Sequence, residues 1–171
     1  IIGESFLNIN SANYLFHSLK NFLIKNNKYT DEWNPLNILS TNASTVGNFD
    51  LDIVNNKVNL INGLNENKFE LLYLLGQDDL VFNKKNEFVI YQGSHGDRGA
   101  EIADVILPGA AYTEQSSHYT NLEGKIQKAY KASYPPGDAK EDWQIINELA
   151  EMMNNRKLFN DKDELESSMF N

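Results

Sequence analysis

The fold is decided by the stretch Glu70-Leu71-Leu72-Tyr73-Leu74-Leu75, which Gly76 closes. The stretch is apolar without polar alternation, which is typical of a strand that is covered on both faces. Two later runs have the same character: Phe88-Val89-Ile90-Tyr91, and Ala103-Asp104-Val105-Ile106-Leu107, which Pro108-Gly109 ends. Short apolar runs between turn residues predict an α/β domain whose mainly parallel sheet contains residues 71–75, 88–91 and 104–107.

Flanking helices are predicted outside these runs. Ser11 is placed to cap a helix whose apolar side chains recur at helical spacing, namely Leu15, Leu19, Phe22 and Leu23. Residues 1–3 are expected to end a strand, and residues 36–39 to form a short one, with Trp33 anchoring the preceding turn to the core. The stretch 42–59 is rich in asparagine and is expected to be a loop with a short helix.

A second helix is predicted after the rigid turn Pro135-Pro136-Gly137. Asp138 is expected to start it, with Glu141 three residues later in a capping-box arrangement. Its predicted apolar face consists of Trp143, Ile146, Leu149, Ala150 and Met153. We therefore expect one domain over residues 1–153, followed by a charged tail over residues 154–171 that packs weakly or lies on a partner.

Composition excludes several classes of function. The chain has 171 residues, 41% of them hydrophobic, no cysteine and a net charge of −9. Without cysteine, this chain has no disulfide, thiolate nucleophile or cysteine-ligated cluster. Its scattered Lys and Arg residues offer no basic patch for nucleic acid, and no apolar run is long enough to span a membrane. The chain does not begin with Met, so we expect it to be part of a longer polypeptide.

The segment Gly93-Ser94-His95-Gly96-Asp97-Arg98-Gly99 follows a predicted strand. Such a turn can bring backbone N–H groups close to a phosphate, but its spacing matches neither G-x-G-x-x-G nor a P-loop. The simpler interpretation is a tight connection with glycines at positive φ, in which His95, Asp97 and Arg98 bond locally. Ser94, His95 and Asp97 have the residue types of a hydrolytic triad, although immediate neighbours rarely point at one another.

Two other groups of polar residues can be considered as sites. A metal site needs convergent ligands, and no H-x-x-x-H or H-E-x-x-H spacing joins the available candidates His95, Asp97, Glu114, His118 and Glu123. Asn121 and Glu123 are compatible with ligand binding. They are also compatible with a turn in which Gly124 leads into a following strand. His17 lies among apolar residues on the first predicted helix and is interpreted as a surface or hydrogen-bonded core residue.

Several unusual blocks occur in an order that resembles a known family. They run from Gln92 to Ala100, from Ala103 to Glu114, from Thr120 to Gly124, and over Pro135–Gly137 and Glu141–Trp143. In this order they are similar to the C-terminal region of the large iron–sulfur subunits of respiratory complex I (NADH:ubiquinone oxidoreductase). The resemblance covers about residues 71–153. The blocks Ala103–Pro108 and Thr120–Glu123 are also shared with molybdopterin oxidoreductases such as formate dehydrogenase.

The resemblance implies a molybdopterin-oxidoreductase-like, Rossmann-like α/β domain that has lost the molybdenum cofactor. It implies no catalytic, cofactor-binding or metal-binding residue in this chain, with iron–sulfur clusters and FMN elsewhere in the complex. The implied partners are the N-terminal, cluster-bearing part of the same subunit and other subunits of the peripheral arm, without nucleic acid or a membrane span. The implied location is the matrix side of the mitochondrial inner membrane, or the cytoplasmic face of a bacterial membrane.

Three functions therefore compete. The first is a structural, non-redox portion of complex I, which supports NADH-to-quinone electron transfer at clusters elsewhere and catalyses nothing by itself. The second is a fragment of a cofactor-bearing molybdopterin oxidoreductase such as formate dehydrogenase. The resemblance implies that loops near this position touch the pterin nucleotide in such relatives, and that His95–Gly99 replaces their usual loop in this chain. The third is an unrelated nucleotide-binding or hydrolytic enzyme. The first requires apolar surfaces for packing, and the other two require a ligand pocket.

Overall fold

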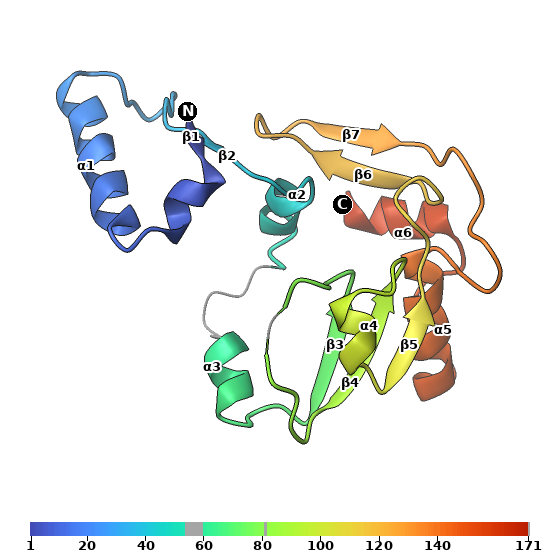
Figure 1. Cartoon of the computed structure of the whole chain (residues 1–171). Helices are drawn as coiled ribbons and strands as arrows, with labels where there is room; N and C mark the ends of the chain where they lie inside the picture. Colours follow the sequence, from blue (N-terminus) through green and yellow to red (C-terminus); the bar gives the residue numbers. More distant parts are fainter. Residues whose placement is uncertain (54–59, 81, 171) are drawn as a thin grey trace. The chain divides into compact units, whose positions relative to one another are not determined.

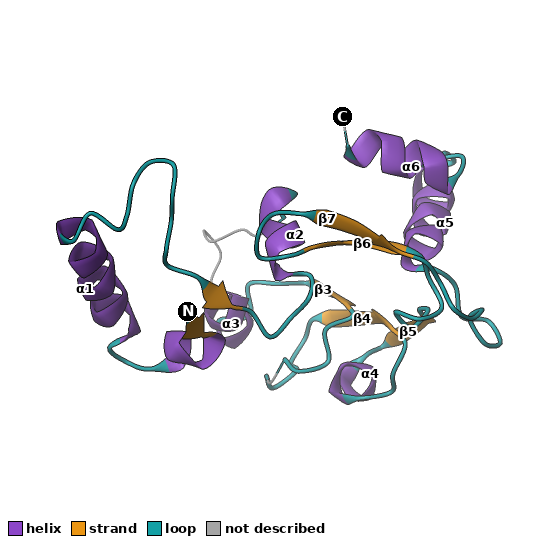
Figure 2. Ribbon diagram, turned by 90° about the horizontal axis from the view of Figure 1, so that it is seen from above, coloured by secondary structure: helices purple, strands orange, loops and turns teal. Residues whose placement is uncertain are grey.

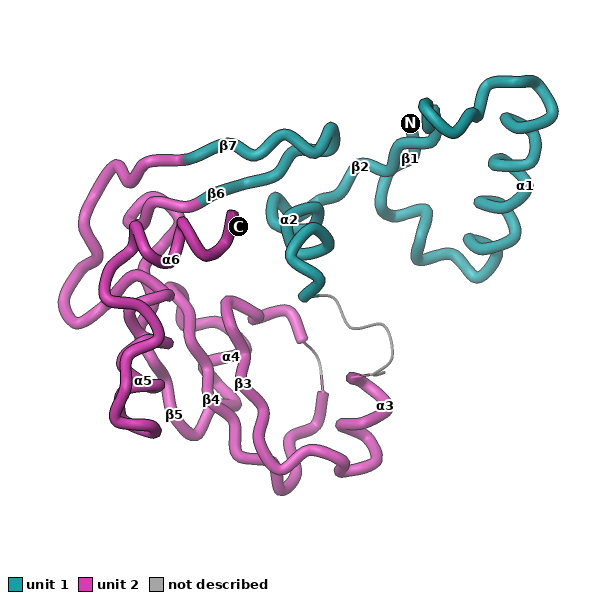
Figure 3. The backbone as a smooth tube through the Cα atoms, turned by 180° about the vertical axis from the view of Figure 1, so that it is seen from behind, with its two compact units in different colours: residues 1–55, 118–128 teal, residues 56–117, 129–171 magenta. Residues whose placement is uncertain are grey.

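The computed structural model describes residues 1–53, 60–80 and 82–170. The chain divides into two compact units, drawn in different colours in Figure 3. The first unit contains residues 1–55 and 118–128, and the second contains residues 56–117 and 129–171. The second unit therefore includes the stretch predicted to be a separate tail, and the domain boundary at residue 153 stays a prediction.

The first unit is built from short elements. The two-residue strands β1 (Ile2–Gly3) and β2 (Ile38–Leu39) lie in the two stretches where the sequence predicted strands. They pair in parallel, which the sequence did not predict. Between them lie the 3-10 helix Glu4–Asn8 and the helix α1 (Ala12–Lys25). Ser11 occupies the predicted N-cap position of α1, but its side chain makes no capping hydrogen bond. The helix α2 (Thr45–Asp50) is the short helix expected in the asparagine-rich stretch, of which residues 54–59 lie outside the described residues.

The first unit has little core of its own. No residue from 1 to 53 is fully buried, and Phe22 on α1 is 61% exposed. Trp33, predicted to anchor a turn to the core, is 65% exposed, so that prediction is wrong. A tryptophan near a Pro-containing turn is a core candidate on hydrophobicity alone, but burial requires a second layer of side chains above it.

The second unit contains the predicted parallel sheet. Its strands β3 (Leu71–Leu75), β4 (Phe88–Gly93) and β5 (Val105–Pro108) pair in the order β3-β4-β5, and both pairs are parallel. All three predicted strands are therefore confirmed within one residue at their starts and two at their ends. Figure 1 shows the three strands side by side. The helices of the second unit are α3 (Leu60–Asn65), α4 (Arg98–Ile102), α5 (Asp142–Asn154) and α6 (Lys162–Met169).

The core lies on one face of this sheet. Val89 is fully buried and Tyr91 is 2% exposed, and Leu72, Leu74, Leu64 and Phe82 pack with them. On the other face, Leu71 and Phe88 stay about half exposed, although they are neighbours across the β3–β4 ladder. The predicted cover on both faces is therefore incomplete: Leu71 and Leu75 are about half exposed on this second face, whereas Tyr73 is partly buried and Gln92 fully buried there.

The helix α5 begins later than the sequence suggested. Glu141, not Asp138, is its N-cap, and Glu141 and Gln144 form the capping box. Lys140 instead makes a parallel bridge with Gly109. The buried side chains of α5 are Ile145 and Asn147, while Met153 of the predicted apolar face is 81% exposed.

The strands β6 (Ser117–Thr120) and β7 (Ile126–Ala129) pair as a two-stranded sheet, seen edge-on in Figure 2. Within the ranges that the structure describes, no helix combines the length and the apolar character that a membrane span requires.

Candidate functional site

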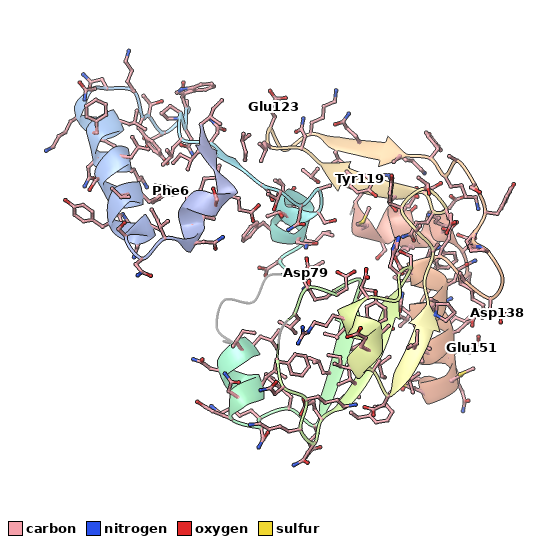
Figure 4. All side chains as sticks on the ribbon, in the orientation of Figure 1. Phe6, Asp79, Tyr119, Glu123, Asp138 and Glu151 are labelled. Atoms are coloured by element: carbon pink, nitrogen blue, oxygen red, sulfur yellow. The ribbon has the colours of Figure 1, made fainter. Side chains whose placement is uncertain are left out.

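The carboxyl ends of β4 and β5 meet beside a pocket of about 540 Å³. In parallel α/β sheets, this edge is where ligands usually bind. Asp138, labelled in Figure 4, belongs to the lining. The other lining residues are Gly93, Ser94, His95, Pro108, Gly109, Ala111, Glu114, Pro136 and Ala139.

The glycine-rich segment beside this pocket folds around the ring of Tyr91. A Cβ atom added at Gly99 would lie 2.6 Å from two ring carbons of Tyr91, and one added at Gly93 would lie 2.5 Å from its Cζ. The Tyr91 hydroxyl donates to the carbonyl oxygen of His95 at 3.0 Å, and burial raises the pKa of the phenol. Gly93 and Gly99 are therefore needed for space, whereas a Cβ atom at Gly96 would meet nothing within 4 Å. The prediction of positive φ in this segment is wrong; the positive-φ glycines are Gly76, Gly124 and Gly137.

Two residues of the candidate hydrolytic triad do contact each other. Ser94 Oγ lies 2.9 Å from His95 Nδ1, contrary to the expectation for immediate neighbours. Asp97 is the N-cap residue of α4, and its carbonyl oxygen accepts the amides of Ala100 and Glu101. Both side chains of the Ser94–His95 pair are exposed, so water competes for this hydrogen bond.

A buried polar network lies under the pocket. The Gln92 side chain is fully buried and donates to Asp142 Oδ1 at 2.8 Å, while the Tyr73 hydroxyl donates to Gln92 Oε1. Gln115 donates to the second oxygen of Asp142 at 2.9 Å. Burial, and then the negative charge of Asp142, raise the pKa of Tyr73. The network joins β4 to the start of α5, and every buried side-chain polar atom among the described residues has a partner.

Glu141 forms a second polar centre in this unit. Its carboxylate accepts hydrogen bonds from Lys162 at 2.8 Å, Lys131 at 3.2 Å and the Trp143 indole at 3.1 Å. Burial by itself raises the pKa of Glu141, but the donors from Lys162, Lys131 and Trp143 outweigh burial, so the pKa lies below its ordinary value. Glu141 is also the N-cap residue of α5, where its backbone amide donates to Gln144 Oε1 at 3.2 Å.

Asn121 has a structural role in the β6–β7 turn. Its Oδ1 accepts the amides of Glu123 at 3.0 Å and Lys125 at 2.9 Å, and Gly124 has φ +77°. Figure 4 shows Glu123 at the end of the hairpin and Tyr119 on β6. The geometry supports the turn interpretation of this block. A second pocket, of about 290 Å³, lies beside the hairpin and includes Asn121 in its lining.

The metal candidates do not converge in the described residues. Residues 1–53, 60–80 and 82–170 contain no group of three or more His, Asp or Glu side chains arranged to hold a metal ion. Glu114 Oε2 instead accepts the amide of Ala111 at 3.0 Å, which closes a local turn. His17 is exposed on α1, with its ring against that of Phe16, as the surface interpretation predicted.

The fold and these sequence blocks define a class. Residues 1–152 match the family model of the molybdopterin oxidoreductases, and the chain belongs to that family. Within it, the chain is similar to the large subunits of NADH-quinone oxidoreductase, and the predicted resemblance is confirmed.

Three relatives show the extent of this similarity. The NADH-ubiquinone oxidoreductase 75 kDa subunit of Reclinomonas americana is 43% identical over 159 residues, which are 91% of this chain and 23% of that protein. An NADH-quinone oxidoreductase subunit of Rickettsia bellii is 42% identical over 99% of this chain and 24% of its own length. The mitochondrial NADH-ubiquinone oxidoreductase 78 kDa subunit of Neurospora crassa is 37% identical over 99% of this chain and 23% of its own length. The chain thus spans about a quarter of the length of these relatives.

The family name implies a molybdopterin, which is an anionic group that the pocket would have to accept. Phosphates require N–H donors or cations. Several of the pocket's backbone donors are already used, because Gly109, Ala111 and Ala139 donate to protein oxygens. The charged side chains in the lining are the carboxylates Glu114 and Asp138. The side-chain donors of the lining, Ser94 and His95, bond to each other, and no Lys or Arg belongs to the lining, so this pocket gives a phosphate-bearing pterin no Lys or Arg partner.

Sequence reasoning missed the residues that organise this region. Gln92 carried a usable signal, because a glutamine at the end of an apolar strand must find a buried partner. Lys131 and Lys162 carried none, since nothing in their spacing points to the same carboxylate.

Proposed function

We propose that this chain is an architectural, non-redox portion of the large subunit of an NADH-quinone oxidoreductase. It catalyses nothing alone and packs against the cluster-bearing part of the same subunit and other peripheral-arm subunits. The proposed location is the matrix face of the mitochondrial inner membrane or the cytoplasmic face of a bacterial one. Iron–sulfur clusters and FMN belong to other parts of the complex.

The observation that carries this proposal is the position of Tyr91. Its ring fills the space above Gly93 and Gly99, where a phosphate-binding loop would leave its backbone open. The absence of cysteine from the chain supports the same view, because iron–sulfur clusters are held mainly by thiolates. The similarity to NADH-quinone oxidoreductase subunits supports the choice of complex.

The first test is purification of the membrane complex through a tag on this chain, with assays of molybdenum, pterin and iron. The expected result is co-purification with the other complex I subunits, without stoichiometric molybdenum or pterin. A stoichiometric pterin would favour a working molybdopterin oxidoreductase and refute the proposal. Purification without any other subunit would refute it too.

The second test separates architecture from catalysis. Tyr91→Leu removes the buried ring and is expected to lower the amount of assembled complex, while turnover per assembled complex stays within about twofold. Tyr112→Leu is the control for folding, because Tyr112 is 75% exposed in this chain and its loss should change the free energy of unfolding by no more than about 0.5 kcal/mol. Normal assembly of the Tyr91→Leu complex with abolished turnover would contradict the proposal.

A further inference from the structure

The C-terminal segment 155–170 folds back onto its own unit, and two residues, Asn147 and Lys162, make polar contacts that hold it there. It begins at Asn155, the C-cap of α5, which has a left-handed backbone with φ 51°. Figure 1 shows the short connection from α5 to α6. Asparagine is among the residues that tolerate this conformation, and it reverses the chain at the helix end. Asn155 is therefore the hinge of the segment.

The first contact is made by Asn147 of α5, which is 8% exposed. Its Oδ1 accepts the amides of Leu158 at 2.7 Å and Phe159 at 3.1 Å, and its Nδ2 donates to the carbonyl of Phe159 at 2.8 Å. One amide side chain thus satisfies three main-chain groups of the incoming segment. Whether the charged tail packs weakly or lies on a partner stays a prediction, and within the chain Asn147 gives this stretch a polar attachment.

The second contact is made by Lys162, the first residue of α6. Its ammonium donates to Glu141 Oε2 at 2.8 Å and to the carbonyl of Ser116 at 2.5 Å. The Lys162 side chain is 26% exposed, so solvent screens this pair only in part. Lys162 therefore connects three stretches of the chain that are distant in sequence.

Apolar anchorage of the segment is weak by comparison. No residue of α6 is buried, and Leu158 and Phe170 are each 52% exposed. In the sheet, by contrast, Val89 is fully buried and Tyr91 is 2% exposed. Because the free energy of local opening follows the apolar surface that a region buries, the two regions differ in opening free energy.

We propose that residues 155–170 form a latch, a segment that detaches as one unit before the sheet unfolds. Asn155 is the hinge about which the segment moves, Asn147 is the clamp that binds its main chain, and Lys162 is the catch that binds Glu141 and Ser116. Opening breaks the bonds to Glu141 and Ser116 together, because both belong to the same ammonium group. Glu141 keeps Lys131 and the Trp143 indole while the latch is open, and its backbone amide keeps the bond to Gln144 Oε1 at the start of α5. The proposed opening of the latch does not depend on the proposed role of the chain in complex I.

Amide hydrogen exchange of the full chain tests the latch. In the unaltered chain, the amides of Leu158 and Phe159 are expected to exchange together, roughly tenfold or more faster than the amide of Val89. The Val89 amide reports on the sheet because it donates to Asp104 at 2.8 Å. Equal rates for the latch and the sheet would overturn the proposal.

Variants then test the catch and the clamp. Lys162→Met should raise exchange of the latch amides on the order of tenfold and leave Val89 unchanged, while Lys162→Arg should restore much of the protection. Lys157→Met is the matched control, because this exposed cation in the same segment lies 3.8 Å from Glu151. Asn147→Ala should raise exchange at Leu158 and Phe159. Equal effects of Lys162→Met and Lys157→Met, or equal effects of Lys162→Met on latch and sheet, would refute the assignment.

Discussion

Replacing Gly99 by alanine tests whether the glycine-rich segment exists to house Tyr91. The added Cβ atom would lie 2.6 Å from two carbons of the Tyr91 ring and 2.9 Å from the carbonyl oxygen of Gln77. Neither neighbour can retreat easily, because the ring is 2% exposed and the carbonyl belongs to the backbone. Gly96→Ala is the matched control, since a Cβ atom there meets nothing within 4 Å.

The magnitude follows from two opposing effects. Overpacking costs about 1–3 kcal/mol, and the upper part of this range, about 2–3 kcal/mol, applies here because neither neighbour can retreat. Alanine recovers ~1 kcal/mol of helix propensity in α4, which leaves a net loss of about 1–2 kcal/mol. For a chain of 171 residues, this corresponds to a decrease in Tm of about 2–8 °C. Thermal and urea unfolding measure it, and Gly96→Ala should stay within about 0.5 kcal/mol of the unaltered chain.

A double variant identifies the ring as the cause. Tyr91→Leu shortens the side chain that the new methyl group meets, so Gly99→Ala should cost less in that background, by on the order of 1 kcal/mol. The reasoning is refuted if Gly99→Ala is neutral, if Gly96→Ala costs as much, or if the two substitutions are additive.

Three further predictions concern the polar residues. Since the pKa of Glu141 is lowered in the folded chain, its ionised form stabilises the fold above its ordinary pKa of 4.5, and this stability is lost as the pH falls through the folded pKa. Glu141→Gln should therefore be less stable at neutral pH and lose less stability than the unaltered chain between pH 5 and 3, roughly, in urea titrations. Asn121→Ala removes the acceptor of two turn amides and should lower the free energy of unfolding by about 1 kcal/mol, whereas Glu123→Ala should be neutral; the reverse order would point to a ligand site. His95→Ala should lower the amount of assembled complex, measured by native gels, more than the turnover per assembled complex, measured by NADH oxidation. Full assembly without turnover would show a catalytic role.

The secondary structure of the sheet could be predicted because its cause is local. The apolar runs at 71–75, 88–91 and 104–107 have no helical or alternating period, and each ends at turn residues. The sequence predicts that α5 starts at Asp138, because the spacing from Asp138 to Glu141 resembles a capping box. The structure uses Glu141 and Gln144 instead, and spacing cannot distinguish the two without knowing which carboxylate meets Lys131 and Lys162.

The location of the candidate site could be predicted from the sequence, but the packing that requires its glycines could not. A glycine-rich segment after a parallel strand belongs at the carboxyl edge of the sheet, and the pocket lies there. The reason for the glycines was not predictable, because the ring that fills their space comes from Tyr91 on the preceding strand. Whether Tyr91 points toward the segment depends on the register of β4 with β3 and β5.

The sequence by itself determined the family, the three parallel strands and the absence of thiolate chemistry, because these follow from residue order and composition. Tertiary structure alone decided that Gln92 and Asp142 share a buried network, and that Lys131 and Lys162 meet on Glu141. Residues 131 and 162 are separated by the whole of α5, and no local spacing encodes such a meeting. The physical reason is that a buried carboxylate must be paired wherever the folded chain brings it, and the partner is chosen by proximity in space.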